Sequence, residues 1–360
     1  MEKKITKSFD RFVCANVCFF DAYPSQSGSG VVCWDFFQSI PIRRKKFFQL
    51  NQKTVKNKFI SNIKIYRNNP FFKILSIPSL IKSISSFLDG YKKKILIIEG
   101  PSWAFYSFIL ISFFKFFKKN LKIIYRSHSI EYEIRKNNSN IFIRFLTFFF
   151  ENMIFKLSDV STSVSKIEQK KIKQYYKKKT ILFPNCINYE LLKKLKIKKI
   201  KKLPYKFIFY CGSYKYAPNK KAIDTIINEI LPELKSKNIH FVFTGDSSIK
   251  FDDKYVINLQ KVEKSELKYL YKKCLALILP ITEGYGTRIK VLEALAFGVP
   301  IVSTPKGVEG INTNNVNFIK ITKNIKKFPH YILSIKKDNI KNKFEYNMNY
   351  FTKAFFKNLF

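Results

Sequence analysis

The sequence feature that most constrains the fold is a regular alternation of short apolar runs with longer segments of helical periodicity. In the first half of the chain, five apolar runs have the length and composition of buried strands: 12–20, 95–99, 122–126, 160–164 and 180–183. Strands that alternate with helices are typical of βαβ units, which assemble into a parallel sheet. We therefore predict an α/β fold.

The alternation is interrupted once, between residues 193 and 206. The run KKLKIKKIKKLPYK contains eight lysines and one proline, a composition typical of a solvated linker. Beyond it the pattern restarts, with a helical stripe over Ala222–Leu234 and predicted strands at 206–211, 240–244, 255–259, 275–279 and 300–303. The 360 residues are enough for two domains at about 150 residues each, and we place the boundary in the lysine run.

Residues 282–304, TEGYGTRIKVLEALAFGVPIVST, hold the strongest local signal. Five of the 11 glycines fall within residues 284–310, which indicates backbone that turns sharply or approaches a ligand closely. A strand, a glycine turn and a helix start together point backbone N–H groups at a phosphate, and Gly298 followed by Pro300 ends the helix. Arg288 and Lys290 fall in the first turn, which prefers acidic side chains, so an external anion is expected there.

The helix that follows presents three kinds of group in order along one face. Lys290 and Glu293 stand four and seven residues beyond Gly286, so bare backbone, a cation and a carboxylate line up. This order suits a nucleoside diphosphate, with the phosphates at the helix start and the ribose hydroxyls on Glu293. The alternative is a surface pair of Lys290 with Glu293 and a solvated Arg288.

This stretch resembles the donor-site signature of the family 4 retaining glycosyltransferases, which have the GT-B fold. Further stretches agree with the family in order: RSHSIEYEIR at 126–135, SDVSTSVSKIEQ at 158–169, FPNCIN at 183–188 and CGSYKYAPNKKAID at 211–224. The resemblance implies two Rossmann-like domains facing a central cleft. Residues 1–200 would bind the acceptor, residues 201–335 would bind the sugar nucleotide, and a helical tail, 336–360, would pack back on the N-terminal domain.

The same resemblance implies the roles of individual residues. His128 would reach the donor sugar from the N-terminal domain and is, with Arg288 and Lys290, a candidate catalytic residue; a purely structural role for this histidine is the alternative. The implied substrate-binding residues are Gly28 and Gly30 in a flexible glycine loop, Gly212 and Ser213 across the cleft, and Gly286, Thr287 and Glu293 on the donor. Tyr285 stands where many members have a second glutamate, which leaves the sugar contacts open.

The charge of the chain is strongly positive. Sixty-seven basic residues against 25 acidic ones give a net charge of +42, yet only eight of the basic residues are arginine. Faces that read nucleic acid usually use more arginine, so biased composition or attraction to anionic lipid is favoured over nucleic acid. Peripheral membrane contact is expected near Arg43–Lys46, beside Phe47 and Phe48, because the longest apolar stretch, 103–114, is too short to span a bilayer.

Six cysteines without a CxxC pair and three histidines without ligand spacing indicate buried thiols in a reducing compartment and no metal site. The predicted protein is a cytoplasmic, metal-independent retaining hexosyltransferase, at or near the inner face of the membrane and without a cofactor. It would move a sugar from a nucleotide-sugar donor to a saccharide or lipid-linked acceptor in polysaccharide or glycolipid synthesis. The alternatives are a sugar-nucleotide epimerase of the same fold and a basic nucleic-acid-binding protein.

Overall fold

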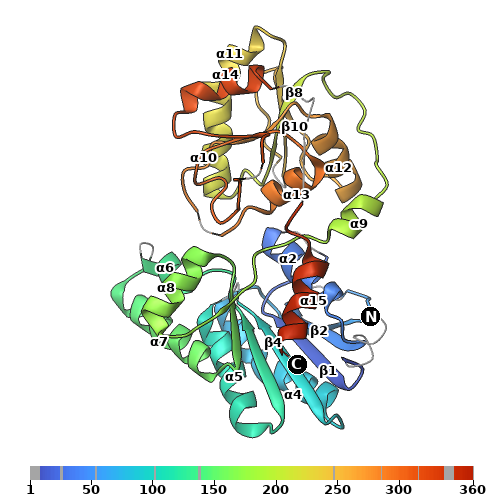
Figure 1. The fold of residues 1–360 in the computed structure, drawn as a ribbon, viewed down its shortest axis with the longest axis vertical. Helices are drawn as coiled ribbons and strands as arrows, with labels where there is room; N and C mark the ends of the chain where they lie inside the picture. Colours follow the sequence, from blue (N-terminus) through green and yellow to red (C-terminus); the bar gives the residue numbers. More distant parts are fainter. Residues whose placement is uncertain are drawn as a thin grey trace. The chain divides into compact units, whose positions relative to one another are not determined.

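The computed structural model describes residues 9–24, 27–52, 55–100, 103–136, 139–245, 248–284, 286–314, 316–335 and 344–359. The chain divides into two compact units, which are described separately (Figure 1). The first unit comprises residues up to Cys186 together with residues from Met348 onward, and the second comprises Ile187–Asn347.

The first unit is built on a parallel sheet with the strand order β3-β2-β1-β4-β5-β6-β7. Its strands are β1 Phe12–Cys18, β2 Arg44–Asn51, β3 Ile60–Lys64, β4 Lys93–Glu99, β5 Leu121–Arg126, β6 Val160–Ser163 and β7 Ile181–Leu182. The chain leaves β1 toward one edge and returns to its other side with β4. The carboxyl ends of β1 and β4 therefore form a topological switch point, where α/β sheets bind ligands.

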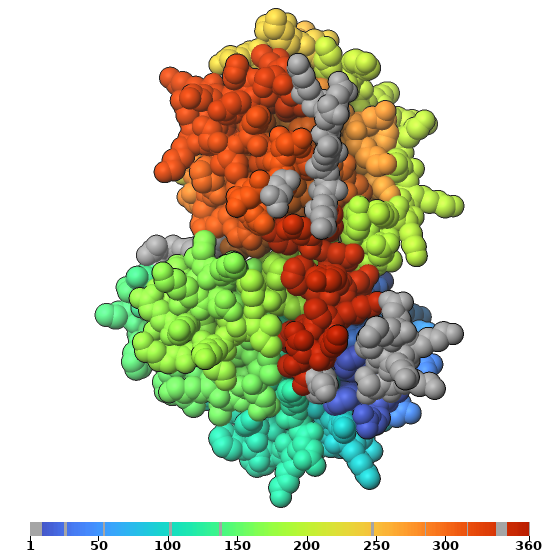
Figure 2. Space-filling model, in the orientation of Figure 1, coloured from blue at the N-terminus to red at the C-terminus, as the bar shows by residue number. Residues whose placement is uncertain are grey.

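Helices cover both faces of this sheet. They are α2 Gly28–Ser39, α3 Pro70–Leu75, α4 Ile77–Leu88, α5 Ala104–Phe117, α6 Glu131–Lys136, α7 Ile141–Leu157, α8 Lys166–Tyr176 and α15 Met348–Leu359. Alternate residues of β1, namely Val13, Ala15 and Val17, join a core cluster that includes buried residues of α4, α5, α7 and α8. The C-terminal α15, red in Figure 2, joins α2 through a 2.8 Å hydrogen bond between the hydroxyls of Ser39 and Thr352.

The second unit has its own parallel sheet, in the order β10-β9-β8-β11-β12-β13. Its strands are β8 Phe207–Cys211, β9 His240–Thr244, β10 Val256–Asn258, β11 Leu277–Leu279, β12 Ile301–Ser303 and β13 Ile319–Ile321. Its helical segments are α9 Tyr189–Lys194, α10 Ala217–Thr225, η1 Ile226–Ile230, α11 Leu231–Lys235, α12 Lys264–Lys273, α13 Ile289–Phe297, η2 Ile325–Lys327 and α14 Phe328–Leu333. Two Rossmann-like parallel-sheet units confirm the predicted fold class.

The structure differs from the expected domain boundary because the beginning of the lysine run is anchored to the second unit. The buried Lys268 of α12 donates 2.8 Å hydrogen bonds to the carbonyls of Leu192, Lys193 and Leu195. Lys198 then pairs with Glu266 at 3.1 Å. The chain therefore enters the second unit at residue 187, before the run that was read as a linker.

Phe47 and Phe48, which stand beside the basic run expected to contact a membrane, are not part of an exposed surface. Both phenyl rings are buried, at 0% and 1% exposure, because the basic run leads directly into β2. Lys45 donates hydrogen bonds to the carbonyls of Gln38 and Ile40. Among the described residues, one helical stretch, Pro70–Leu88, has the length and apolar composition to cross a membrane. Its residues Ile77, Leu80, Ile84 and Leu88 are buried in the first unit.

Candidate functional site

The start of α13 is the centre of the candidate site in the second unit. Gly284 and Gly286 have φ of +98° and +77°, so the turn that leads from β11 into the helix uses backbone conformations that favour glycine. Arg288 is the N-cap residue with extended backbone, and the first turn contains no acidic residue. Gly298 ends the helix at φ 65°. The helix and its unusual cationic start are therefore as predicted, while Tyr285 lies outside the described residues.

Lys290 is turned back against neighbouring side chains of its own unit. Its Nζ lies 4.0 Å from the centroid of the Tyr210 ring and donates to Oδ1 of Asn219 at 3.3 Å. Burial lowers the pKa of this ammonium to about 8. The cation contacts a neutral ring and a neutral amide, so an incoming anion would bring the negative charge that these contacts do not supply.

Asn219 of α10 connects several predicted site residues to one another. Its Oδ1 accepts a 2.8 Å bond from the Tyr210 hydroxyl, and its Nδ2 donates to the carbonyl of Ser213 at 3.0 Å. A Cβ on Gly212 would lie only 2.7 Å from Nδ2, so this position requires glycine for the close approach. The asparagine thus holds Gly212, Ser213 and Lys290 in one constellation. No local pattern marks this asparagine, although it lies within the stretch CGSYKYAPNKKAID.

Glu293 lies one turn beyond Lys290 and is positioned by a buried tyrosine. The hydroxyl of Tyr271, from α12, donates to Glu293 Oε2 at 2.9 Å and lies 3.3 Å from the carbonyl of Lys290. Burial first, and the Glu293 carboxylate second, raise the pKa of Tyr271 well above its usual value. The hydrogen bond fixes one carboxylate oxygen. The remaining predicted residue, Thr287, is partly buried between Gly286 and Arg288.

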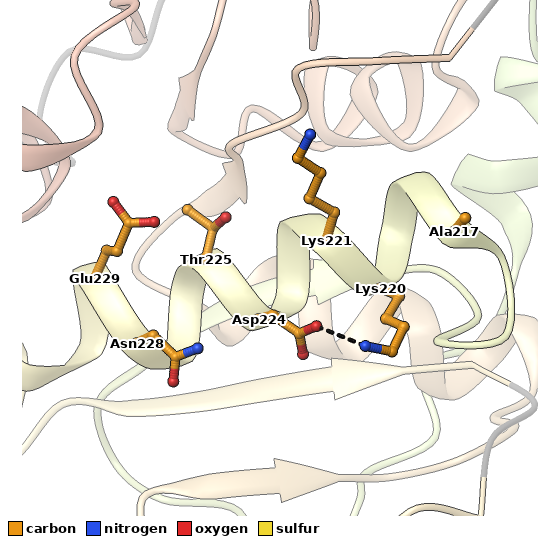
Figure 3. A pocket seen from close by; sticks show the side chains of 7 residues that line it. All are labelled: Ala217, Lys220, Lys221, Asp224, Thr225, Asn228 and Glu229. Atoms are coloured by element: carbon orange, nitrogen blue, oxygen red, sulfur yellow. Dashed lines mark hydrogen bonds and ion pairs between the residues drawn. The ribbon is translucent and has the colours of Figure 1, made fainter.

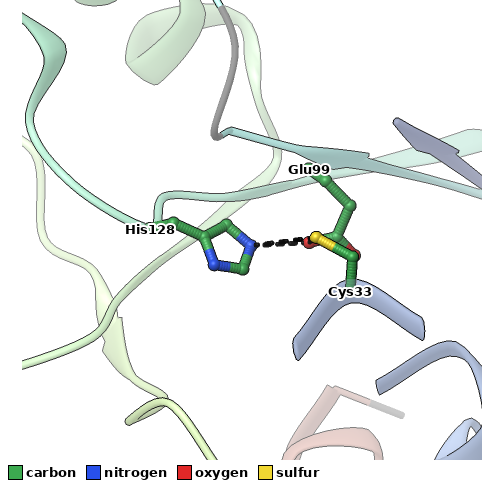
Figure 4. A group of neighbouring side chains, drawn as sticks. All are labelled: Cys33, Glu99 and His128. Carbon is green, nitrogen blue, oxygen red and sulfur yellow. Dashed lines mark hydrogen bonds and ion pairs between the residues drawn. The ribbon is translucent and has the colours of Figure 1, made fainter. Parts of the chain in front are cut away.

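The first unit has a separate cluster of polar side chains at the carboxyl ends of its central strands. Arg126, which ends β5, donates to both carboxylate oxygens of Glu99, which ends β4, at 2.8 Å. His128 Nε2 lies 2.7 Å from Glu99 Oε2, and Asn16 Nδ2 donates to Oε1 at 2.9 Å. Cys33 Sγ of α2 lies 3.6 Å from Oε2 (Figure 4). These side chains occupy the switch point between β1 and β4.

The negative charge of Glu99 is compensated within the protein. Burial alone would raise the pKa of Glu99, but Arg126 and His128 lower it to about 2. Burial also disfavours the charged imidazole, but Cys33 and the Glu99 hydrogen bond raise the pKa of His128 to about 9. The Cys33 thiol has its pKa raised well above 9 by burial, so we assign the positive charge of His128 to its contact with the ionised Glu99. Contact with the ionised Glu99 therefore favours the protonated imidazole, which donates its Nε2–H to that carboxylate.

Cys33, Glu99 and His128 also have the donor types of a zinc site, and their ligand atoms lie within 4.8 Å of one another. However, both oxygens of Glu99 accept from Arg126, and His128 Nε2 lies on the same carboxylate. A divalent cation would have to displace protons from His128 and Cys33 beside a fixed guanidinium. The cluster therefore suits protonated His128 and Cys33 side chains better than a bound metal ion.

Sequence reasoning found His128 but missed the groups that surround it. Glu99 and Arg126 each follow a run of apolar strand residues, ILII and IIY, and polar residues at strand ends are the signal that could have found them. Asn16 and Cys33 sit inside an apolar strand and an apolar helix, where nothing local marks them.

Gly28 and Gly30 lie in the first turn of α2, where a flexible loop was expected. Ser27 caps this helix, accepting a 3.1 Å hydrogen bond from the backbone N–H of Gly30. Gly30 is buried, and a Cβ there would lie 3.2 Å from the carbonyl oxygen of Ala22. The predicted glycine pair therefore belongs to a helix start, while the preceding residues 25–26 lie outside the described part of the chain.

The predicted site residues thus form two groups, one on each unit. A separate hollow in the second unit is lined by residues of α10 and η1: Ala217, Lys220, Lys221, Asp224, Thr225, Asn228 and Glu229 (Figure 3). Its Lys220 and Asp224 pair with each other at 3.1 Å, and the lining includes none of the predicted site residues. This hollow is therefore distinct from the α13 constellation.

Residues 205–338 match the family model described as Glycosyl transferases group 1. The matched residues lie within the second unit and include the constellation around α13. This confirms the resemblance read from the sequence. No curated protein matches the chain by sequence.

Solved structures are similar to nearly the whole chain. Sucrose-phosphate synthase from Thermosynechococcus elongatus has 14% identity and a TM-score of 0.64 over 96% of this chain and 94% of its own. Anabaena Alr3699/HepE in complex with UDP-glucose has 11% identity and a TM-score of 0.62 over 96% and 98%. UDP-GlcNAc 2-epimerase from Methanocaldococcus jannaschii has 10% identity and a TM-score of 0.60 over 97% and 99%. Identities this low show the fold, which is GT-B.

Proposed function

We propose that the protein is a retaining glycosyltransferase that uses a nucleotide-sugar donor. The observation that carries the proposal is the start of α13, where Arg288 and Lys290 stand in a first turn without acidic residues. An anion at this position gains from the helix dipole, from the backbone N–H groups and from two cations at once. The match of this unit to a glycosyltransferase family and the UDP-glucose bound to a protein of the same fold support a sugar nucleotide.

Each residue of the constellation has a role in this proposal. The backbone from Gly286 to Arg288 and the ammonium of Lys290 hold the diphosphate and stabilise the charge that develops on it as the sugar leaves. Glu293, oriented by Tyr271, accepts from the ribose hydroxyls. Leaving-group stabilisation by fixed cations requires neither a metal nor a cofactor, and the nucleotide sugar is itself a substrate.

His128 supplies the first unit's contribution. As an imidazolium held by Glu99, it presents a hydrogen-bond donor at the switch point of the first sheet. Such a donor suits a sugar hydroxyl or a developing negative charge. We place the acceptor, a saccharide or lipid-linked saccharide, on this unit. Polysaccharide or glycolipid synthesis at the cytoplasmic face of a membrane is the corresponding pathway class.

Isothermal titration of the full chain against a panel of nucleotide sugars and nucleoside diphosphates tests the proposal. We expect binding of at least one nucleotide sugar, weakened by addition of the matching diphosphate. A panel with no binding by any member would refute it. Product analysis with the bound donor and a set of saccharide acceptors then identifies the transfer and its stereochemistry.

A sugar-nucleotide epimerase is the second candidate, because an epimerase shares the fold at similar TM-score. The two activities separate when the donor is incubated alone and followed by NMR. An epimerase converts the donor without an acceptor, whereas the glycosyltransferase needs one. A nucleic-acid-binding protein, the third reading, would shift nucleic acid on a gel with a steep dependence on salt.

A further inference from the structure

Helix α7 of the first unit has large apolar side chains on its solvent-facing side. Ile141, Phe142, Phe145 and Phe149 are 80%, 66%, 65% and 44% exposed. Their spacing of one, four and eight residues places them on one face of the helix. We refer to these four residues as the α7 face. Contiguous apolar exposure of this kind on a folded domain marks an interaction site.

The orientation of α7 is fixed by contacts on its opposite side. Ile154 and Phe155 are fully buried in the core, and Phe150 contacts Phe105 of α5 at 4.8 Å between ring centroids. Glu151 is also buried, and its carboxylate accepts the backbone N–H groups of Glu131 and Tyr132 at 2.8 and 3.0 Å. The apolar face is therefore turned outward by the packing of the helix.

The exposed charged side chains of α7, and Lys136 before it, are positive, while Glu131 and Glu133 of the neighbouring α6 pair with Arg135 and Lys171. Arg144 lies on the helix itself, Lys156 follows Phe149 by seven residues on the same face, and both Lys156 and the preceding Lys136 are exposed. The acidic residue of α7, Glu151, is buried and occupied as a helix cap. A partner for this face must offer apolar contact and negative charge together.

A second copy of the chain does not meet that requirement. A symmetric contact through the α7 face would bring the same lysines and arginine of both copies together, on a chain whose net charge is +42. An anionic bilayer meets it, because aromatic side chains enter the boundary between headgroups and acyl chains while basic side chains contact the phosphates.

We propose that the α7 face is the surface by which this protein docks on an anionic membrane. The phenyl rings of Phe142, Phe145 and Phe149 would enter the interface, with Lys136, Arg144 and Lys156 on the lipid phosphates. This gives the membrane contact named in the proposed function a specific surface, on the unit assigned to the acceptor. Its test measures binding alone, so its failure is distinguishable from failure of the glycosyltransferase proposal.

The test is co-sedimentation of the full chain with vesicles of phosphatidylcholine alone or mixed equally with phosphatidylglycerol. We expect wild-type protein on the mixed vesicles, released by high salt, and roughly tenfold weaker binding for the combined Phe142→Ser, Phe145→Ser and Phe149→Ser variant. The matched control is Phe71→Ser with Leu75→Ser. These residues are 63% and 58% exposed on α3. That helix follows β3 at the far edge of the same sheet, and the control should bind like wild type.

Further measurements keep the result decisive. Melting followed by Trp34 and Trp103, both in the first unit, should be unchanged in the triple variant, because the removed rings are outside the core. In a Phe145→Trp protein, brominated lipid should quench the new fluorophore. Equal binding of the triple variant and wild type would overturn the proposal, as would wild-type protein that ignores mixed vesicles. A wild-type dimer that the triple variant loses in sedimentation velocity would assign the face to a second copy instead.

Discussion

The two groups of candidate site residues handle charge in opposite ways. In the first unit, the carboxylate of Glu99 is met by Arg126 and His128 inside the protein, and all three side chains are buried. At the start of α13, the cation of Lys290 contacts an amide oxygen and an aromatic ring, in a turn that contains no acidic residue. In the first arrangement the carboxylate already has its counter-ions within the protein, whereas the second gains from an added anion. The difference separates a cluster that positions His128 as a hydrogen-bond donor from a helix start that receives an anionic ligand.

The largest expected effect comes from breaking the buried pair of Glu99 with Arg126. Arg126→Met leaves the carboxylate of Glu99 buried without its guanidinium and should cost about 3–5 kcal/mol of unfolding free energy. The arginine also packs 3.5 Å from the centroid of the Phe36 ring, a contact that methionine retains in part. Denaturant unfolding followed by tryptophan fluorescence measures the change, because Trp34 and Trp103 both lie in the first unit.

The paired variant provides the control for this experiment. Combining Arg126→Met with Glu99→Gln removes both charges of the pair and should recover a large part of the lost stability, since His128 can then lose its proton and no buried charge is left uncompensated. If the single variant unfolds at the same denaturant concentration as wild type, the cluster is not held by its charges and the contrast between the two sites fails.

The next effect concerns the carboxylate of the second unit. Glu293→Gln keeps an oxygen for the Tyr271 hydroxyl, so the fold should persist. Loss of a charge-assisted bond to the ribose is worth about 1.5–3 kcal/mol, which predicts about ten- to a hundredfold weaker donor binding. Titration calorimetry compares it with Glu309→Gln, a partly exposed carboxylate that pairs with Lys306. Unchanged donor affinity in Glu293→Gln would give this residue a structural role.

A smaller effect follows from the lowered pKa of Lys290, about 8. A bound diphosphate stabilises the ammonium and raises this pKa, so binding takes up a proton above pH 8. Affinity should be constant below about pH 7 and fall as pH rises past 8, by up to about tenfold per pH unit. Lys290→Arg should flatten the profile because arginine stays charged. Calorimetry across this pH range measures the affinity for the diphosphate. A wild-type affinity that does not change with pH would show that Lys290 does not contact the diphosphate.

The same lysine bears on stability in the absence of ligand. Its pKa is lower in the folded protein than the ordinary lysine value of 10.5. The unfolded chain therefore binds more protons between pH 8 and about 10.5, so this group's contribution to stability rises with pH there. That trend runs opposite to the expected loss of ligand affinity, which makes the two measurements complementary.

How far the sequence predicts this molecule depends on whether a signal is local. The start of α13 and its end at Gly298 were predictable, because glycine conformation and helix dipole act within a few residues. The strands β2 and β3 were missed because the first begins in a basic run and the second, ISNIK, is short and half polar. The network of Asn219 was also missed, since it joins residues 71 positions apart, and only the fold brings them together.

The smallest expected effect returns to the cation that caps α13. Arg288 is the N-cap residue, and its guanidinium donates to the carbonyl of Glu283 at 3.1 Å. A cation at a helix start opposes the helix dipole by a few tenths of a kcal/mol, so Arg288→Ala should leave the ligand-free melting temperature unchanged or slightly raised. With a nucleoside diphosphate bound, the same residue makes a charge-assisted contact, and the variant should show a reduced ligand-induced shift. Lys290→Ala should behave in the same way, except that this variant also loses the contact of the lysine side chain with Tyr210. Melts followed by circular dichroism, with and without the diphosphate, measure the ligand-free melting temperature and the ligand-induced shift. A variant that loses ligand-free stability but keeps the full wild-type shift would show that these cations serve the fold, and the anion would have no part in explaining their position.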